Sequence, residues 1–201
     1  MSESFNGWTQ GVWFYGPVLG LGLLLVFLGL FILWFFRDFS REITAAPLEI
    51  VSPADGKVVG IEDFDESPYY EGPTRRVSVF MSIFDAHVNR APFDGTVTRV
   101  AHKNGRYKNA MNPESSQVNE SNAVYLDTAH GPITVRQIAG AVARRIVCVA
   151  ETGTEFEKGE KFGMIRLGSR AELYLPPGTE VCVNEGEQVY AGSSVLEIGR
   201  A

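Results

Sequence analysis

Three side chains of the kinds that together activate a nucleophile are spread widely along this 201-residue chain: Ser169, His87 and Asp55. A base that takes the proton of a serine hydroxyl, and an acid that orients that base, prepare the serine for attack on a carbonyl. The carbonyl that Ser169 reaches most easily is that of Gly168, the residue before it. The pattern therefore predicts that the chain cleaves its own backbone between Gly168 and Ser169.

Each of these residues also has an ordinary structural interpretation. A lone histidine is most often a satisfied structural side chain, and Asp55-Gly56 taken alone is typical of a turn. His102 and His130 have no motif around them, so for these two we expect only a structural role.

The elements that must position these residues are mainly strands. Beyond Thr44, short runs rich in Val, Ile, Phe and Tyr alternate with polar residues and stop at Gly, Asn or Asp, which predicts a β-barrel or sandwich. The expected strands are 57–61, 76–83, 95–101, 123–128, 133–138, 145–149, 163–167, 172–175, 180–183 and 194–198.

Three segments depart from this strand pattern. Residues 137–143 are a candidate for one short helix or turn, and the polar stretch 104–121 predicts a long functional or mobile loop. The tail from Leu175 predicts a tight pair of hairpins that resembles the half-barrel of biotinyl and lipoyl carrier domains. It has no lysine to modify, which argues against a carrier function.

The N-terminal part predicts a membrane anchor over residues 1–36, followed by one domain over residues 37–201. Residues 11–36 carry no charged side chain, and a helix over 18–36 would match a hydrocarbon core of about 30 Å. A cleaved signal peptide is disfavoured because the N-terminus carries Glu3 and no Lys or Arg. Pro17 and nearby glycines leave a re-entrant hairpin open.

The charges predict where the domain lies and what it avoids. Arg37 and Arg41 follow the apolar run and no basic residue precedes it, which places the domain on the cytoplasmic side of the cell membrane. All 18 basic residues but only 23 of the 24 acidic residues follow residue 36, so the domain has a formal charge of −5, which argues against nucleic acid as a partner. A basic stretch over 90–108 is either a solvated face or a surface for anionic headgroups. Cys148 and Cys182 show no metal spacing and are expected to be buried free thiols.

Three segments carry a resemblance to a known family. Ser52-Pro-Ala-Asp-Gly-Lys57, Phe84-Asp-Ala-His-Val-Asn-Arg-Ala-Pro92 and Phe162-Gly-Met-Ile-Arg-Leu-Gly-Ser-Arg170 resemble the short, membrane-anchored class of phosphatidylserine decarboxylases, in the family's order. Supporting matches are Asn119-Glu120, Gln137-Ile-Ala-Gly140 and Ala143-Arg-Arg-Ile146. The resemblance covers nearly the whole chain.

The resemblance implies a self-processing, pyruvoyl-dependent enzyme that decarboxylates phosphatidylserine, or a related serine phospholipid, to the ethanolamine form. Loss of CO2 from an amino acid needs an electron sink that no side chain supplies. The resemblance implies that a pyruvoyl group made from Ser169 is this sink and forms a Schiff base with the substrate amine. It further implies that His87 takes the Ser169 proton, that Asp55 orients the imidazole, and that the products are a large chain 1–168 and a small chain 169–201. Whether the protein forms a homo-oligomer stays open.

One position departs from the pattern of the longer members of this family. They carry a second histidine three residues after the first, and here that position is Arg90. This departure leaves two possibilities: His87 serves both cleavage and decarboxylation, or Arg90 holds the substrate. Because guanidinium binds oxyanions bidentately, we expect Arg90 to bind the substrate carboxylate or phosphate.

Two other functional classes compete with this interpretation. A membrane-anchored serine hydrolase would use the same Ser, His and Asp, but Gly168-Ser169 lacks the Gly-x-Ser-x-Gly elbow. A non-enzymatic, carrier-like adaptor barrel would leave the three residues without a function.

Overall fold

The computed structural model describes residues 3–142, 145–166, 168–176, 178 and 180–199. The chain divides into two units, Met1–Arg37 and Asp38–Ala201. The first unit contains the helix α1 (Glu3–Phe35), which runs without interruption through Pro17 and so does not form a hairpin. Its segment Tyr15–Phe35 has a mean hydropathy of 2.8 and is long and apolar enough to cross a membrane.

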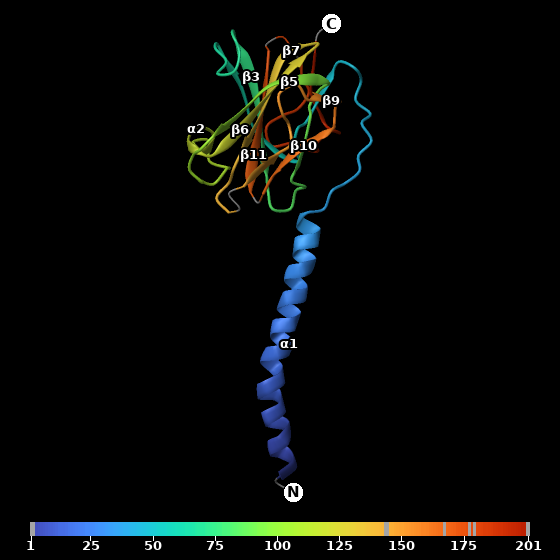
Figure 1. Ribbon diagram of the computed structural model, residues 1–201, viewed down its shortest axis with the longest axis vertical. Helices are drawn as coiled ribbons and strands as arrows, with labels where there is room; N and C mark the ends of the chain where they lie inside the picture. The colour runs from blue at the N-terminus through green and yellow to red at the C-terminus, as the bar shows by residue number, and fades with distance from the viewer. Residues whose placement is uncertain (1–2, 143–144, 167, 177, 179, 200–201) are drawn as a thin grey trace. The chain divides into compact units, whose positions relative to one another are not determined.

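The second unit is built almost entirely of strands, as the alternating pattern predicted (Figure 1). The strands are β1 (Glu49–Val51), β2 (Gly56–Phe64), β3 (Thr74–Met81), β4 (Val88–Arg90), β5 (Gly95–Lys103), β6 (Ser121–Thr128), β7 (Gly131–Ile138), β8 (Ile146–Cys148), β9 (Glu155–Phe156), β10 (Lys161–Ile165), β11 (Ser169–Leu175), β12 (Glu180–Val181), β13 (Gln188–Val189) and β14 (Val195–Ile198). The one short helix within this unit's described residues is α2 (Ser115–Val118).

The strands form three antiparallel sheets. The largest has eight strands in the order β13-β2-β3-β11-β7-β6-β5-β9, and two three-stranded sheets have the orders β1-β14-β12 and β4-β10-β8. In the large sheet β11 lies between β3 and β7, so the strand that begins with Ser169 is held by backbone pairing on both sides.

Alternation along β11 separates an apolar face from a polar one. Ala171, Leu173 and Leu175 join the buried apolar core. Glu172, on the other face, is fully buried and lies among the guanidinium groups of three arginines: Arg76, Arg136 and Arg170. The β11 backbone is therefore fixed by packing as well as by pairing.

Two expectations about this unit were wrong in part. In the candidate helix or turn 137–143, Gln137 and Ile138 are strand, because they pair with Asn122 and Ser121 across β7 and β6, whereas residues 141 and 142 form a turn and Ala143 lies outside the described residues. The polar stretch 104–121 is mostly irregular but contains α2, and its Asn119 side chain donates hydrogen bonds to the Lys108 and Ala139 carbonyls at 2.8 Å; its functional or mobile character stays a prediction. Cys148 is half-buried and Cys182 is exposed, although both are free thiols.

Candidate active site

Ser169 is the first residue of β11 and is fully buried. It pairs with Met81, the last residue of β3, and its hydroxyl donates a hydrogen bond to the Met81 Sδ at 3.4 Å. A thioether is a weak acceptor. The hydroxyl is therefore withdrawn from bulk solvent without being held by a strong protein acceptor at that contact.

Gly168, the residue on the other side of the predicted cleavage site, has a backbone conformation that favours glycine. Its φ of +67° lies in the left-handed region, where a side chain is disfavoured. A Cβ built at Gly168 would meet nothing within 4 Å, so the preference comes from the backbone rather than from crowding. The residue before it, Leu167 of the quoted motif, lies outside the described residues.

His87 lies in the segment that connects β3 to β4 and is fully buried. Its Nδ1 lies 2.9 Å from the carbonyl oxygen of Asp85. Since a carbonyl only accepts, Nδ1 carries the proton, and Nε2 is the basic nitrogen of the neutral ring. The backbone carbonyl of His87 also accepts a hydrogen bond from the Ile165 amide, three residues before Gly168. The ring thus has the tautomer that a general base needs, although its orienting partner at Nδ1 is a backbone carbonyl.

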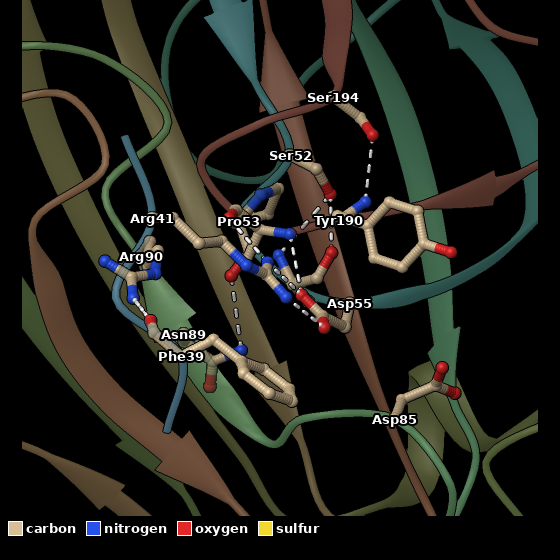
Figure 2. A network of polar contacts seen from close by, with 12 residues as sticks. Phe39, Arg41, Ser52, Pro53, Asp55, Asp85, Asn89, Arg90, Tyr190 and Ser194 are labelled. Carbon is tan, nitrogen blue, oxygen red and sulfur yellow. Dashed lines mark hydrogen bonds and ion pairs between the residues drawn. The ribbon is translucent and has the colours of Figure 1, made fainter. Parts of the chain in front are cut away.

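Asp55 lies in the turn that enters β2, with its side chain only 6% exposed. The next residue, Gly56, packs directly against β3, because a Cβ there would lie 2.1 Å from the Phe80 carbonyl oxygen and 3.2 Å from the Met81 Cα. Both Asp55 carboxylate oxygens accept hydrogen bonds from the Arg41 guanidinium, at 2.5 and 2.6 Å. Figure 2 shows this pair, with the Asp55 carboxylate directed at Arg41.

The structure brings the predicted residues to one end of β3 but gives each side chain a different contact. Gly56 flanks Met81 on one side of β3 and Ser169 pairs with it on the other, so two strand spacings, about 10 Å, separate those backbones. In the folded chain Asp55 contacts Arg41, His87 contacts the Asp85 carbonyl, and Ser169 contacts Met81. The three residues therefore belong to segments that meet at this end of β3, and their action on one another stays a prediction.

Arg90, at the end of β4, is buried and its guanidinium has protein partners. It donates hydrogen bonds to the carbonyls of Gly159 and Phe39, each at 2.8 Å, and lies 3.7 Å from the Asp38 carboxylate. Burial lowers the pKa of Arg90, and the Asp38 carboxylate opposes this shift. The guanidinium predicted to bind the substrate's oxyanion is thus hydrogen-bonded to two protein carbonyls and lies near a protein carboxylate, and substrate binding by Arg90 stays a prediction.

Sequence reasoning missed a buried row of amides beside the site. Asn122 donates to the Gln137 Oε1 at 3.1 Å, and Gln137 donates to the Asn89 Oδ1 at 2.9 Å. Asn89 in turn donates to the Pro53 carbonyl at 3.4 Å, and its Nδ2 lies 4.0 Å from the Met81 Sδ that Ser169 contacts. Asn89 and Gln137 belong to the motifs quoted for the resemblance, which was the available signal for them.

Arg41 was also missed, since the sequence indicated only its charge beside the membrane helix. No spacing links residue 41 to residue 55, and only the folded chain brings them together. Among the described residues, no group of three or more His, Cys, Asp or Glu side chains is arranged to hold a metal ion.

Comparison with known proteins decides between the functional classes. The family model described as Phosphatidylserine decarboxylase matches residues 28–197. The chain belongs to the phosphatidylserine decarboxylase family. This assignment sets aside the serine hydrolase and the carrier-like adaptor.

Individual relatives support the family over the full length of the chain. The "Phosphatidylserine decarboxylase proenzyme" of Carboxydothermus hydrogenoformans is 39% identical over 208 residues, which cover 98% of each chain. Proteins of the same description from Magnetococcus marinus and Burkholderia ambifaria are 42% and 43% identical, over 84% and 87% of this chain and 77% and 79% of their own.

Phosphatidylserine decarboxylases are pyruvoyl-dependent and acquire the group by self-cleavage. The site fits such a group, because a buried serine follows a glycine whose backbone is held in the left-handed region, with open space beside its Cα. The predicted base His87 lies in the segment that follows β3 and contacts the Asp85 carbonyl, and the predicted acid Asp55 precedes β2 and contacts Arg41.

Proposed function

We propose that this chain is a phosphatidylserine decarboxylase proenzyme whose cleavage site is the Gly168–Ser169 bond, with Ser169 as the source of the pyruvoyl group. The observation that carries this proposal is the position of Ser169: buried, at the first residue of a strand that is paired on both sides, and preceded by a glycine with a φ of +67°. The family assignment supports the reaction, and the geometry supports the residue.

Self-cleavage follows from the groups around this bond. The Ser169 hydroxyl loses its proton to the His87 Nε2 and adds to the Gly168 carbonyl carbon; the Ser169 nitrogen then takes up that proton and leaves as the amine, so the amide becomes an ester. Elimination removes the Ser169 Cα proton and breaks the Cβ–O bond, which releases the Gly168 carboxylate and leaves dehydroalanine. Hydrolysis of that residue consumes one water, releases ammonia and leaves the pyruvoyl end. The proposed role of Asp55 is to stabilise the charge that His87 acquires.

The pyruvoyl group supplies a ketone that takes the substrate amine and draws electrons from the breaking C–C bond. The residues of this chain bind and orient the phospholipid headgroup around it. Arg90 is proposed to bind the carboxylate or phosphate, for which its guanidinium would exchange the nearby Asp38 carboxylate for the substrate's oxyanion.

The two products are proposed to remain one folded unit. Within the described part of residues 169–201, β11 pairs with β3 and β7, β13 pairs with β2, and β14 pairs with β1. Cleavage after Gly168 therefore leaves the small chain built into the sheets of the large chain.

The domain is proposed to work on the cytoplasmic side of the cell membrane, against the headgroups of its lipid substrate. The apolar helix α1 supports anchoring, and Arg37 directly after it supports this orientation by the positive-inside rule. The chemistry occurs at the headgroup, so either acyl-ester or ether lipid tails are compatible with it.

Intact mass spectrometry of the purified protein tests this proposal. We expect two chains, 1–168 and 169–201, with the small one blocked to Edman sequencing by its pyruvoyl end. The variant Ser169→Ala should remain a single chain and be inactive, because it removes the nucleophile and the source of the cofactor together. Active wild-type protein consisting of one chain with an unmodified Ser169 would disprove the proposal.

A further inference from the structure

We propose that Arg41, contributed by the chain just after the membrane helix, is a positioning residue of the self-cleavage site. It holds the Asp55 carboxylate in one orientation, so that the site is incomplete without the juxtamembrane segment 38–41. This inference rests on the proposed role of Asp55.

The contact between Arg41 and Asp55 has the geometry of a bidentate ion pair. Arg41 Nη1 lies 2.5 Å from Asp55 Oδ1, and Nη2 lies 2.6 Å from Oδ2. The two side chains are 14% and 6% exposed, so water screens this pair far less than a surface pair. The hydrogen bond to Asp55 raises the pKa of Arg41, which is therefore permanently charged.

Arg41 also connects Asp55 to the part of the chain that becomes the small product. Its Nη1 donates to the Ala191 carbonyl at 2.7 Å, while the Ala191 amide donates to Asp55 Oδ1 at 2.8 Å. The guanidinium carbon lies 5.7 Å from the centre of the Tyr190 ring, next to Ala191 (Figure 2). Arg41, Asp55 and Ala191 are thus joined pairwise by hydrogen bonds, so that each residue restricts the position of the other two.

The segment that carries Arg41 is itself held in place. Arg90 donates to the Phe39 carbonyl at 2.8 Å and lies near Asp38, as Figure 2 shows for Arg90 and Phe39. The cavity left between segment 38–41 and Asp55 has a volume of only about 10 Å³. Segment 38–41 is therefore tied to the domain through the Phe39 carbonyl and the Arg41 guanidinium, although the Phe39 side chain is 48% exposed.

This ion pair has a consequence for chemistry. A buried carboxylate is costly unless it is paired and hydrogen-bonded, and Arg41 supplies both interactions to Asp55. A guanidinium compensates the charge and fixes the carboxylate plane through two parallel hydrogen bonds, whereas an ammonium supplies only a point charge. Arg41 is thus suited to orient Asp55, although it need not touch the reacting atoms.

The experiment compares self-cleavage of full-length precursors in Arg41→Gln, Arg41→Lys, Asp55→Asn and Arg75→Gln, followed over time by electrophoresis and intact mass. Arg75→Gln is the matched control, because Arg75 forms a similar two-point pair with Asp63, at 2.6 and 3.0 Å, on the β2–β3 hairpin. We expect Arg41→Gln to process at least about tenfold more slowly than wild type, Arg41→Lys to process at an intermediate rate, and Arg75→Gln to process normally.

A rescue experiment separates a positioning role from a purely structural one. Guanidinium ion at tens of millimolar should partly restore processing to Arg41→Gln, which a purely structural role would not explain. Thermal unfolding of each precursor checks that it is folded.

Normal processing of folded Arg41→Gln would overturn the inference. The Asp55→Asn variant then separates this inference from the proposed function. If Asp55→Asn does not cleave itself, the proposed function stands and only the role of Arg41 is wrong. If Asp55→Asn also processes normally, the role of Asp55 in the proposed function is wrong as well. Should Arg41→Gln fail to fold, Arg41→Lys decides, since wild-type processing in that variant overturns the requirement for a bidentate guanidinium.

Discussion

At the scale of single residues, the site separates the groups that would react from the groups that hold them. Ser169 and His87 are fully buried, and the contacts of the imidazole and of the hydroxyl run to a backbone carbonyl and to a thioether. Neither of these two partners carries a charge. The charged contacts are concentrated at Asp55, Arg41 and Arg90 instead.

His87→Ala should slow self-cleavage by about 10²-fold or more, because it removes the proposed base. Time courses of the precursor, followed by intact mass, measure this effect. His102→Ala is the control, since His102 is half-exposed and its Nε2 lies near the side chains of Asn104 and Glu120. Normal processing of His87→Ala would mean that another group takes the Ser169 proton.

Arg90→Lys should weaken use of the phospholipid much more than it slows self-cleavage. Lysine keeps the charge but loses the planar fork that now reaches two carbonyls and that is proposed to bind the headgroup. Processing and turnover of phosphatidylserine in mixed micelles are to be measured side by side, with KM and kcat resolved. A variant that stalls in processing as completely as Ser169→Ala would assign Arg90 to cleavage and remove its substrate-binding role.

At the scale of elements, the end of β3 is the common support of the site. Gly56 packs on its Phe80 carbonyl, Ser169 pairs with Met81, and the segment carrying His87 begins directly after it. Close approach of the β2 backbone to β3 therefore sets how near Asp55 comes to the other two residues.

Gly56→Ala should destabilise the fold by about 1–3 kcal/mol and impair processing, because the added Cβ would lie 2.1 Å from the Phe80 carbonyl oxygen. Gly60→Ala in the same strand is the control, since the nearest atom to a Cβ there is a Glu62 side-chain oxygen at 3.6 Å. Denaturant unfolding of Ser169→Ala precursors that carry either change separates stability from processing. Equal stability of the two variants would show that the strands readily move apart at Gly56.

At the scale of the whole molecule, the domain Asp38–Ala201 is arranged so that breaking one peptide bond need not break the fold. All seven residues of β11 pair with β3, and five of them also pair with β7. The apolar residues of β11 belong to the buried core that the rest of the domain forms.

The processed chains should therefore stay together through purification without any covalent link. Size-exclusion chromatography in detergent should give one species that contains both chains, and they should separate only when denaturant unfolds the domain. Dissociation of the small chain under native conditions would contradict the observed strand pairing as the basis of assembly.

The sequence by itself determined the apolar helix, the predominance of strands and the chemistry of the motifs, because these depend on local composition and residue order. Alternating apolar residues indicated β11 without any knowledge of its neighbours, and Ser169, His87 and Asp55 were recognised from short motifs. Gln137 and Ile138 were misjudged because pairing with β6 outweighed a local preference for a helix or turn, which the chain reaches only at residues 141 and 142.

Only the tertiary structure decided which groups contact one another. Arg41 and Asp55 are 14 positions apart, and Asn89 and Gln137 are 48 apart, so no local pattern records either contact. These pairs form because the folded backbone buries one polar side chain where another can satisfy it, and an unsatisfied buried polar group is costly. The residue types specified what chemistry this protein performs, and the packing of distant segments decided how that chemistry is held in place.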